Sequence, residues 1–260
     1  MFRILPFAGG EPRSVAEVVN GIMNGKTNNT GSITLATGGA TTTTITDRRI
    51  GPDSIILFMP LTAAANTDAV PYGAFQDSTD QTAANTTTAY AITFDTTDYS
   101  NGVTLANSSQ LNVANAGVYN IQFSIQFKNT TNDTQDVDVW LRKNGTNIDK
   151  SNSRFGLTAR KSSGDPSHVI AALNFFAELA ANDYVEIMWR PSDTGVSLEH
   201  YSTSTTPTRP AVPSVIATLS YVNTSSSFNV YVSSRGQGTA TLTHFANSTA
   251  DKTFGYVIVG

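Results

Sequence analysis

The chain contains no cysteine among its 260 residues, which excludes a disulfide-stapled domain and a thiolate metal site. Charged residues are also scarce, at 14% of the sequence with a formal net charge of −4. Nucleic-acid binding needs a basic surface, so we expect no nucleic-acid partner. The opening stretch Met1–Pro6 has no apolar core of signal-peptide length, and no apolar run approaches membrane-spanning length. We therefore expect a soluble protein without membrane insertion or an obvious export signal.

Recognisable catalytic motifs are missing as well. The chain has no Gly-x-Ser-x-Gly elbow, no P-loop and no His-Glu-x-x-His sequence. None of its histidines has a partner at ligand spacing: His168, His200 and His244. Two carboxylate pairs fit loop positions better than acid–base catalysis, although that chemistry needs no local motif: Asp77 with Asp80, and Asp95 with Asp98. We accordingly expect a non-enzymatic protein without catalytic residues, a cofactor or a metal.

What the chain does contain is sequence that alternates between apolar and polar residues. From Tyr119 to Phe127 every odd position is large and apolar and every even position is polar. This period of two predicts a strand with one face in a core. Further strands are expected over 137–142, 184–189 and 214–222. Asn144-Gly145 predicts a hairpin turn, because both residues accept positive φ.

One stretch, 168–179, is apolar on both of its faces. Read as a strand, it presents Val169, Ala171, Leu173 and Phe175 on one face and Ile170, Ala172 and Phe176 on the other. A strand of an antiparallel sandwich needs only one buried face. A neighbouring subunit is the simplest cover for the second face, since obligate interfaces resemble a divided core. A buried helix is the alternative, because periodicity alone does not separate the two.

Four segments together resemble the C1q/TNF-like jelly roll: Ala116–Tyr119, Leu141–Gly145, Leu179–Ile187 and Ser214–Tyr221. The resemblance covers roughly residues 71–222, and Asn182 stands where that family usually has glycine. It implies a sandwich whose first and last strands lie side by side and which assembles as a compact homotrimer. The expected trimer-interface residues are Val169, Ile170, Leu173, Phe175 and Phe176. The fold hosts many functions, so the resemblance implies no single one.

Shorter strands are expected at both ends of the chain. They fall at 32–35, 41–46 and 54–60, and again at 228–233, 239–245 and 254–259. Three short strands with open edges are poorly stable alone. We therefore predict a mainly β protein in which 31–65 and 226–260 form one split small β module and 66–225 is an inserted jelly roll.

Residues 1–30 are expected to form an arm and one short helix. Ser14 and Glu17 have the spacing of a capping box at a helix start. An apolar stripe recurs at helical spacing: Val15, Val18, Val19 and Ile22. A helix this short is marginal alone, so it must dock on its own β module or on another protein. We expect this stripe to anchor the chain to a larger assembly.

Four further segments lie at the two ends of the chain: Gly25–Gly31, Ile50–Pro60, Gly238–His244 and Thr253–Gly260. Together they resemble a small protein of tailed bacteriophages, in which the matching pieces occur uninterrupted. It implies a virion protein whose partners are other phage proteins. Two functions remain open: a trimeric tail fibre, with the jelly roll facing the host and the arm on the tail, or a capsid decoration or head-fibre protein. A depolymerising tailspike is less favoured because no β-helix repeat occurs.

An acidic group and a tryptophan complete the candidate residues. Asp133, Asp136 and Asp138 could supply oxygen ligands to calcium, but alternation with Val137 and Val139 favours solvent-facing strand positions. Trp140 and Arg142 share that outward face. The tryptophan could stack on a host cell-surface glycan, form an interface or be covered by the N-terminal strand.

Overall fold

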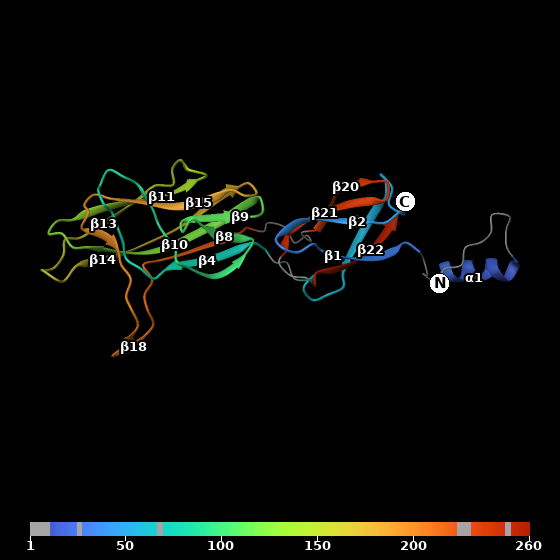
Figure 1. The fold of residues 1–260 in the computed structure, drawn as a ribbon, viewed down its shortest axis with the longest axis horizontal. Helices are drawn as coiled ribbons and strands as arrows, with labels where there is room; N and C mark the ends of the chain where they lie inside the picture. Colours follow the sequence, from blue (N-terminus) through green and yellow to red (C-terminus); the bar gives the residue numbers. More distant parts are fainter. Residues whose placement is uncertain (1–10, 25–27, 67–69, 223–229, 248–250) are drawn as a thin grey trace. The chain divides into compact units, whose positions relative to one another are not determined.

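The computed structural model describes residues 11–24, 28–66, 70–222, 230–247 and 251–260, and the predicted helix and mainly β fold are confirmed (Figure 1). The chain divides into two compact units. Unit 1 comprises Met1–Asp68 with Phe228–Gly260, and unit 2 comprises Ala69–Ser227. Among the residues placed by the structure, no helix is both long enough and apolar enough to span a membrane.

Unit 2 is a sandwich of two antiparallel sheets. In the first, here called the β10 sheet, β10 pairs with β14 on one side and with β19 and β16 on the other. Its strands are β4 (Tyr72–Asp77), β5 (Gln81–Thr82), β7 (Thr96–Asn101), β10 (Gly117–Asn129), β14 (Ser167–Leu179), β16 (Val196–Leu198) and β19 (Val215–Tyr221). The first strand β4 lies beside the last strand β19.

In the second sheet, the β11 sheet, β11 lies between β15 and the short strands β12 and β13. Its strands are β6 (Tyr90–Ala91), β8 (Val103–Ala106), β9 (Gln110–Val113), β11 (Gln135–Lys143), β12 (Thr146–Asn147), β13 (Ser153–Leu157) and β15 (Tyr184–Pro191). A small hairpin, β17 (Ser204–Thr205) with β18 (Thr208–Arg209), projects from the sandwich in Figure 1. This projection was not predicted from the sequence.

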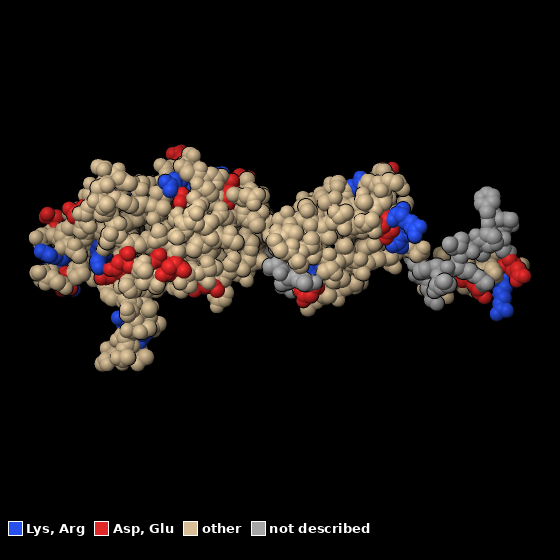
Figure 2. Space-filling view, in the orientation of Figure 1, with Lys and Arg blue, Asp and Glu red and all other residues tan. Residues whose placement is uncertain are grey.

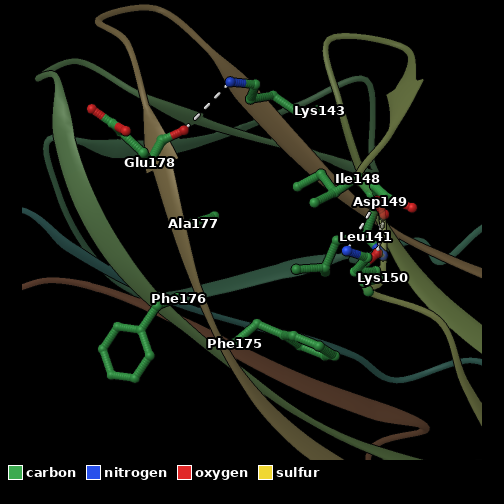
Figure 3. Close-up of a pocket in the computed structure, with 10 residues that line it drawn as sticks. Leu141, Lys143, Ile148, Asp149, Lys150, Phe175, Phe176, Ala177 and Glu178 are labelled. Carbon is green, nitrogen blue, oxygen red and sulfur yellow. Dashed lines mark hydrogen bonds and ion pairs between the residues drawn. The ribbon is translucent and has the colours of Figure 1, made fainter.

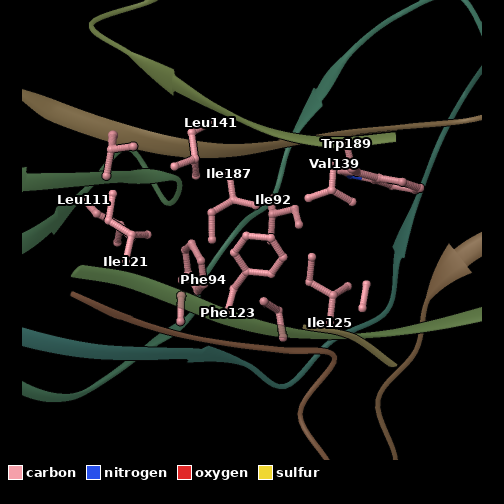
Figure 4. Packing of buried hydrophobic residues seen from close by; sticks show 14 of the residues in the cluster. Ile92, Phe94, Leu111, Ile121, Phe123, Ile125, Val139, Leu141, Ile187 and Trp189 are labelled. Atoms are coloured by element: carbon pink, nitrogen blue, oxygen red, sulfur yellow. The ribbon is translucent and has the colours of Figure 1, made fainter. Parts of the chain in front are cut away.

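The core of unit 2 lies between the two sheets, as Figure 4 shows. Every odd-numbered residue from Tyr119 to Phe127 is buried there, which confirms the predicted alternation. The opposing sheet supplies Val139, Leu141, Ile187 and Trp189. Each large apolar side chain removed from water contributes about 1.5–3 kcal/mol, so this contact is the main source of stability for the sandwich.

The turn residues have the backbone angles that the sequence predicts. Asn144 and Gly145, between β11 and β12, have φ values of 48° and 79°. Asn182, just before β15, has φ of 68°, a left-handed conformation that asparagine tolerates better than most residues. Asn182 can therefore stand where the resembled family has glycine.

Unit 1 contains two three-stranded sheets, and each combines strands from both ends of the chain. In the β22 sheet, β22 (Thr253–Val259) lies between β1 (Thr30–Thr34) and β3 (Ile55–Pro60). In the β21 sheet, β21 (Thr239–Asn247) lies between β2 (Ala40–Thr46) and β20 (Val230–Gly236). The two sheets share a core that includes Ile45, Ile56, Leu242, Phe254 and Ile258.

The helix α1 spans Pro12–Met23. Its N-cap is Glu11, whose carbonyl accepts the backbone N–H groups of Ser14 and Val15 at 2.8 and 3.1 Å. The predicted Ser14–Glu17 capping box is wrong, because Pro12 begins the helix two residues before Ser14. Proline suits this first position, where no intrahelical N–H bond is lost.

Candidate functional site

Strand β14 has one apolar row toward the core and another toward the outside. In the inner row Ala171 is buried, and Phe175 stacks on Phe123 with ring centroids 6.4 Å apart. Val169 and Leu173 also pack against the core. In the outer row Ile170 is 60% exposed and Phe176 is 67% exposed. The predicted two-faced strand is confirmed, and the helix alternative is wrong.

β14 is also an edge strand of the β10 sheet. Its 13 residues pair with β10 over their whole length, and no described strand pairs with its other edge. An exposed edge presents a row of backbone N–H and C=O groups that can pair with another chain. This edge therefore combines backbone polar groups that have no strand partner with an exposed apolar row.

The outward face of the β10 sheet continues this surface across four more strands. Exposed apolar side chains on it include Tyr72, Tyr99, Val118 and Ile216. The register defines three successive cross-strand rows without a charged residue: Phe176, Asn120, Ser220 and Tyr72; Asn174, Gln122, Thr218, Ala74 and Tyr99; and Ala172, Ser124, Ile216 and Gln76. These rows mix apolar and uncharged polar side chains, and Asp98 borders the third row, where it accepts from Gln76 at 2.8 Å. The large exposed apolar residues on this face make it a candidate interaction surface.

An open pocket of about 350 Å³ lies beside this edge, where β14 and the β11–β12 hairpin belong to different sheets (Figure 3). Its apolar lining comprises Leu141, Ile148, Phe175, Phe176 and Ala177. Charged groups stand around it: Lys143, Asp149, Lys150 and Glu178. Lys143 Nζ lies 3.4 Å from the carbonyl oxygen of Glu178, linking the two sheets. The lining suits an apolar side chain or a small apolar group.

A polar network holds the opposite end of β14. Glu199 accepts from Lys128 Nζ at 2.9 Å and from the Tyr201 hydroxyl at 2.6 Å, and His168 Nε2 lies 2.9 Å from the same carboxylate. Burial alone would raise the pKa of Glu199, but these hydrogen bonds lower it below its ordinary range. Burial and the Glu199 carboxylate raise the pKa of Tyr201 to about 12. The network fixes the base of the projecting hairpin.

The acidic residues do not converge on a metal site. The solvent-facing position expected for Asp138 is wrong: its carboxylate is buried and pairs with Arg154 at 2.9 Å and Arg190 at 3.4 Å. Asp133 and Asp136 are exposed, as the strand alternation favours for Asp136. Among the residues described, no group of three or more His, Asp or Glu side chains is placed to hold a metal ion. Asp138 therefore acts as an ion-pair partner within the β11 sheet.

Trp140 is half-buried on the outward face of the β11 sheet. Its Nε1–H donates to Asn147 Oδ1 on the short strand β12 at 2.8 Å. Beside it, Arg142 pairs with the buried Glu186 at 2.8 Å. Strand β12, rather than an N-terminal strand, holds this tryptophan.

The remaining candidate histidines and carboxylates have hydrogen-bond partners within their own units. His200 Nδ1 lies 2.8 Å from Asp80, and His244 is buried 2.8 Å from the Thr43 hydroxyl. Asp77 accepts from Thr79 two residues later in the chain, Asp95 accepts from Ser78, and Asp98 on β7 accepts from Gln76 on the neighbouring strand β4. The Glu199 network was not predicted from the sequence, because Lys128 on β10 and His168 on β14 lie far from Glu199 in the chain.

The helix stripe predicted as an anchor is exposed to solvent. Val15, Val19 and Ile22 are exposed, Val18 is half-buried, and no residue of α1 is buried.

Figure 2 shows charged side chains at scattered positions, with most of the visible surface uncharged. Comparison with known protein families and with curated proteins found no match to this chain.

Proposed function

We propose that this chain is a non-enzymatic structural protein of a bacteriophage virion that assembles as a homotrimer through the sandwich. The observation that carries the proposal is the edge strand β14, whose outward row contains Ile170 and Phe176 at 60% and 67% exposure. The resemblance of unit 2 to the C1q/TNF-like jelly roll supports a threefold arrangement. The resemblance of the two chain ends to a small tailed-phage protein supports the virion.

In this trimer the outward row of β14 and the uncharged face of the β10 sheet lie against neighbouring copies. Each large apolar side chain that becomes buried contributes about 1.5–3 kcal/mol. The interface also depends on the inner row of β14, which packs against the core and holds the strand in place: Val169, Leu173 and Phe175. Assembly then stabilises the folded subunit by mass action.

Within the virion we propose a tail fibre, with the sandwich facing the host cell and residues 1–30 attached to the tail. The helix stripe of Val15, Val18, Val19 and Ile22 supports this attachment, because it is apolar and exposed. A host cell-surface glycan is the proposed ligand of the sandwich, with Trp140 as its aromatic contact.

The trimer is tested by light scattering of the full chain. We expect three times the subunit mass of 27.6 kDa for the native protein and a monomer or an aggregate for Phe176→Asp. Tyr231→Asp is the matched control, because Tyr231 is an aromatic residue of unit 1 with 59% exposure. A stable native monomer would remove the physical support for a fibre.

The location is tested by gold labelling and by quantification of the protein in purified phage particles. Labelling at the tail and tens of copies support the fibre, whereas labelling of the head and hundreds of copies assign the chain to the capsid. Particles assembled with protein lacking residues 1–30 should contain almost none of it. Normal incorporation of that variant would contradict anchoring through the helix.

A further inference from the structure

Unit 1 has an exposed aliphatic face that its own core does not use. Strand β3 alternates between residues that face the core, such as Ile56, and residues that face outward. The outward residues are Ile55, Leu57 and Met59, at 56%, 58% and 63% exposure. Val257 lies opposite Leu57, Val259 lies opposite Ile55, and Leu61 packs beside Gly255. We call these six aliphatic residues the β3 face: Ile55, Leu57, Met59, Leu61, Val257 and Val259.

The β3 face carries no charge. On the neighbouring strand β1 the outward positions are Thr30, Ser32 and Thr34, so hydroxyl groups border the aliphatic residues. A strand that is apolar on both faces is typical of sheets covered on both sides. One side of the β22 sheet packs on the core of unit 1. The other side, the β3 face, is exposed to solvent.

Helix α1 has the complementary surface. Its stripe continues from Val15 through Ile22 to Met23, which is 80% exposed, whereas Arg13 and Glu17 pair with each other on the opposite side. Twelve helical residues span about 18 Å, and the six residues of β3 span about 20 Å. The helix therefore matches the strand in length as well as in polarity.

We propose that α1 docks on the β3 face of its own chain. Six residues, 24–29, separate the end of α1 from the start of β1. Asn29 and Asn28 already bond to unit 1, because their carbonyls accept from Ile258 N–H and from Arg49. The four residues between them and the helix, 24–27, reach about 14 Å. The three strands of the β22 sheet span only about 10 Å from the first to the last, so the helix can reach β3. The short connection gives a high effective concentration, which favours this helix over that of a second copy.

A helix layer on a sheet is a standard way to bury an apolar sheet face. Docking also explains how a helix of this length is maintained, since an isolated helix of twelve residues is marginal in water. The inference does not rest on the virion role of the chain. If the anchoring proposal is also correct, the two contacts use the same stripe, and the docked helix is the form before incorporation.

Disulfide trapping in the full chain tests the proposal, and the absence of native cysteine makes the result unambiguous. We expect Val19→Cys with Leu57→Cys to oxidise within one chain at least tenfold faster than the control pair, Glu17→Cys with Leu57→Cys. The control has the same connection to the sheet but places its helix cysteine opposite the stripe. Equal oxidation rates would overturn the proposal. Disulfide-linked dimers would also overturn it and assign the β3 face to a second copy.

A second measurement avoids dependence on cysteine variants. Docked α1 should show slow amide hydrogen exchange, detected by mass spectrometry of the peptide that covers residues 12–23. Leu57→Asp should raise that exchange rate at least tenfold while the β22 strand stays protected, because Leu57 is exposed and not part of the core. Equal helix exchange in the native and Leu57→Asp proteins would contradict docking on this face.

Discussion

Gly117 begins strand β10 at a point where the Tyr221 ring leaves no room for a side chain. A Cβ atom at this position would lie 2.2 Å from that ring, and the backbone φ is 156°. Tyr221 is held in turn by an edge-to-face contact with Tyr119, with ring centroids 5.5 Å apart. The glycine of the Ala-Gly-Val-Tyr segment thus allows an aromatic residue of β19 to close the end of the core.

We predict that Gly117→Ala lowers the free energy of unfolding of unit 2 by about 1–3 kcal/mol, because overpacking displaces the Tyr221 ring. Both tryptophans of the chain, Trp140 and Trp189, lie in unit 2, so urea denaturation followed by tryptophan fluorescence measures this unit alone. Gly21→Ala in α1 is the control, since no atom lies within 4 Å of the added methyl group. An unchanged midpoint for Gly117→Ala would show that the ring moves at no cost.

Glu199 gives unit 2 a component of stability that depends on pH. Burial raises its pKa, but hydrogen bonds from Tyr201 and Lys128 outweigh this and lower the folded-state pKa below its ordinary value of 4.5. The charged form is therefore favoured by folding. The resulting stability is complete above the unfolded-state pKa and is lost as the pH falls through the folded-state pKa.

We predict that Glu199→Gln costs about 1.5–3 kcal/mol at pH 7, as expected for hydrogen bonds to a charged group, and less at pH 3. Thermal unfolding followed by tryptophan fluorescence at the two pH values measures the difference. Asp149→Asn is the control, because this carboxylate is 90% exposed and its ion pair with Lys150 is long, at 4.0 Å. Equal losses for Glu199→Gln at both pH values would contradict the role of its charge.

At the scale of elements, the strands were predictable wherever one face enters a core, because alternation is a local property. β10, β11 and β15 were predicted this way, and β14 was interpreted as a strand with a buried helix as the alternative. The Asn144-Gly145 turn was predictable because its backbone angles depend on the two residues themselves. The start of α1 was not, since Pro12 and the Glu11 carbonyl competed with the expected cap at Ser14.

The pocket and the polar network could not be predicted from the sequence, because both depend on tertiary structure. The pocket exists because β14 and the β11–β12 hairpin lie in different sheets. The Glu199 network joins residues 71 and 31 positions apart in the chain. The sequence predicted that both faces of 168–179 are apolar, but only the fold shows that this strand lies at a sheet edge.

Adjacent phenylalanines of β14 should have separable roles. Phe175 points toward the core and stacks on Phe123, so Phe175→Ala should destabilise unit 2 by roughly 2–4 kcal/mol. Phe176 points outward, so Phe176→Ala should leave tryptophan-detected unfolding of the dilute protein nearly unchanged and should weaken association at least tenfold. Urea denaturation and analytical ultracentrifugation measure the two effects. Equal effects of both substitutions on stability would contradict this division.

At the scale of the whole molecule, two separate cores exist in one chain. The core of unit 1 is built from both ends of the sequence, with Ile45 and Ile56 from one end and Leu242 and Ile258 from the other. The core of unit 2 uses only residues between them. While unit 2 is folded, its 159 residues (69–227) act as a compact connection between the two halves of unit 1. Once unit 2 unfolds, unit 1 must close a long flexible loop, at an added cost of about 0.6 kcal/mol per doubling of loop length.

This connectivity predicts an asymmetric response to core mutations in the full chain. Leu242→Ala in unit 1 and Ile125→Ala in unit 2 each remove a fully buried side chain, at a cost of about 2–5 kcal/mol. Calorimetry should show two transitions, with tryptophan fluorescence identifying that of unit 2. Leu242→Ala should lower only the unit 1 transition. Ile125→Ala should lower the transition temperature of unit 2. When unit 2 melts first, the halves of unit 1 lose their compact connection, so the transition temperature of unit 1 should also fall by a few degrees. A single transition that both substitutions shift equally would mean that the two cores unfold as one.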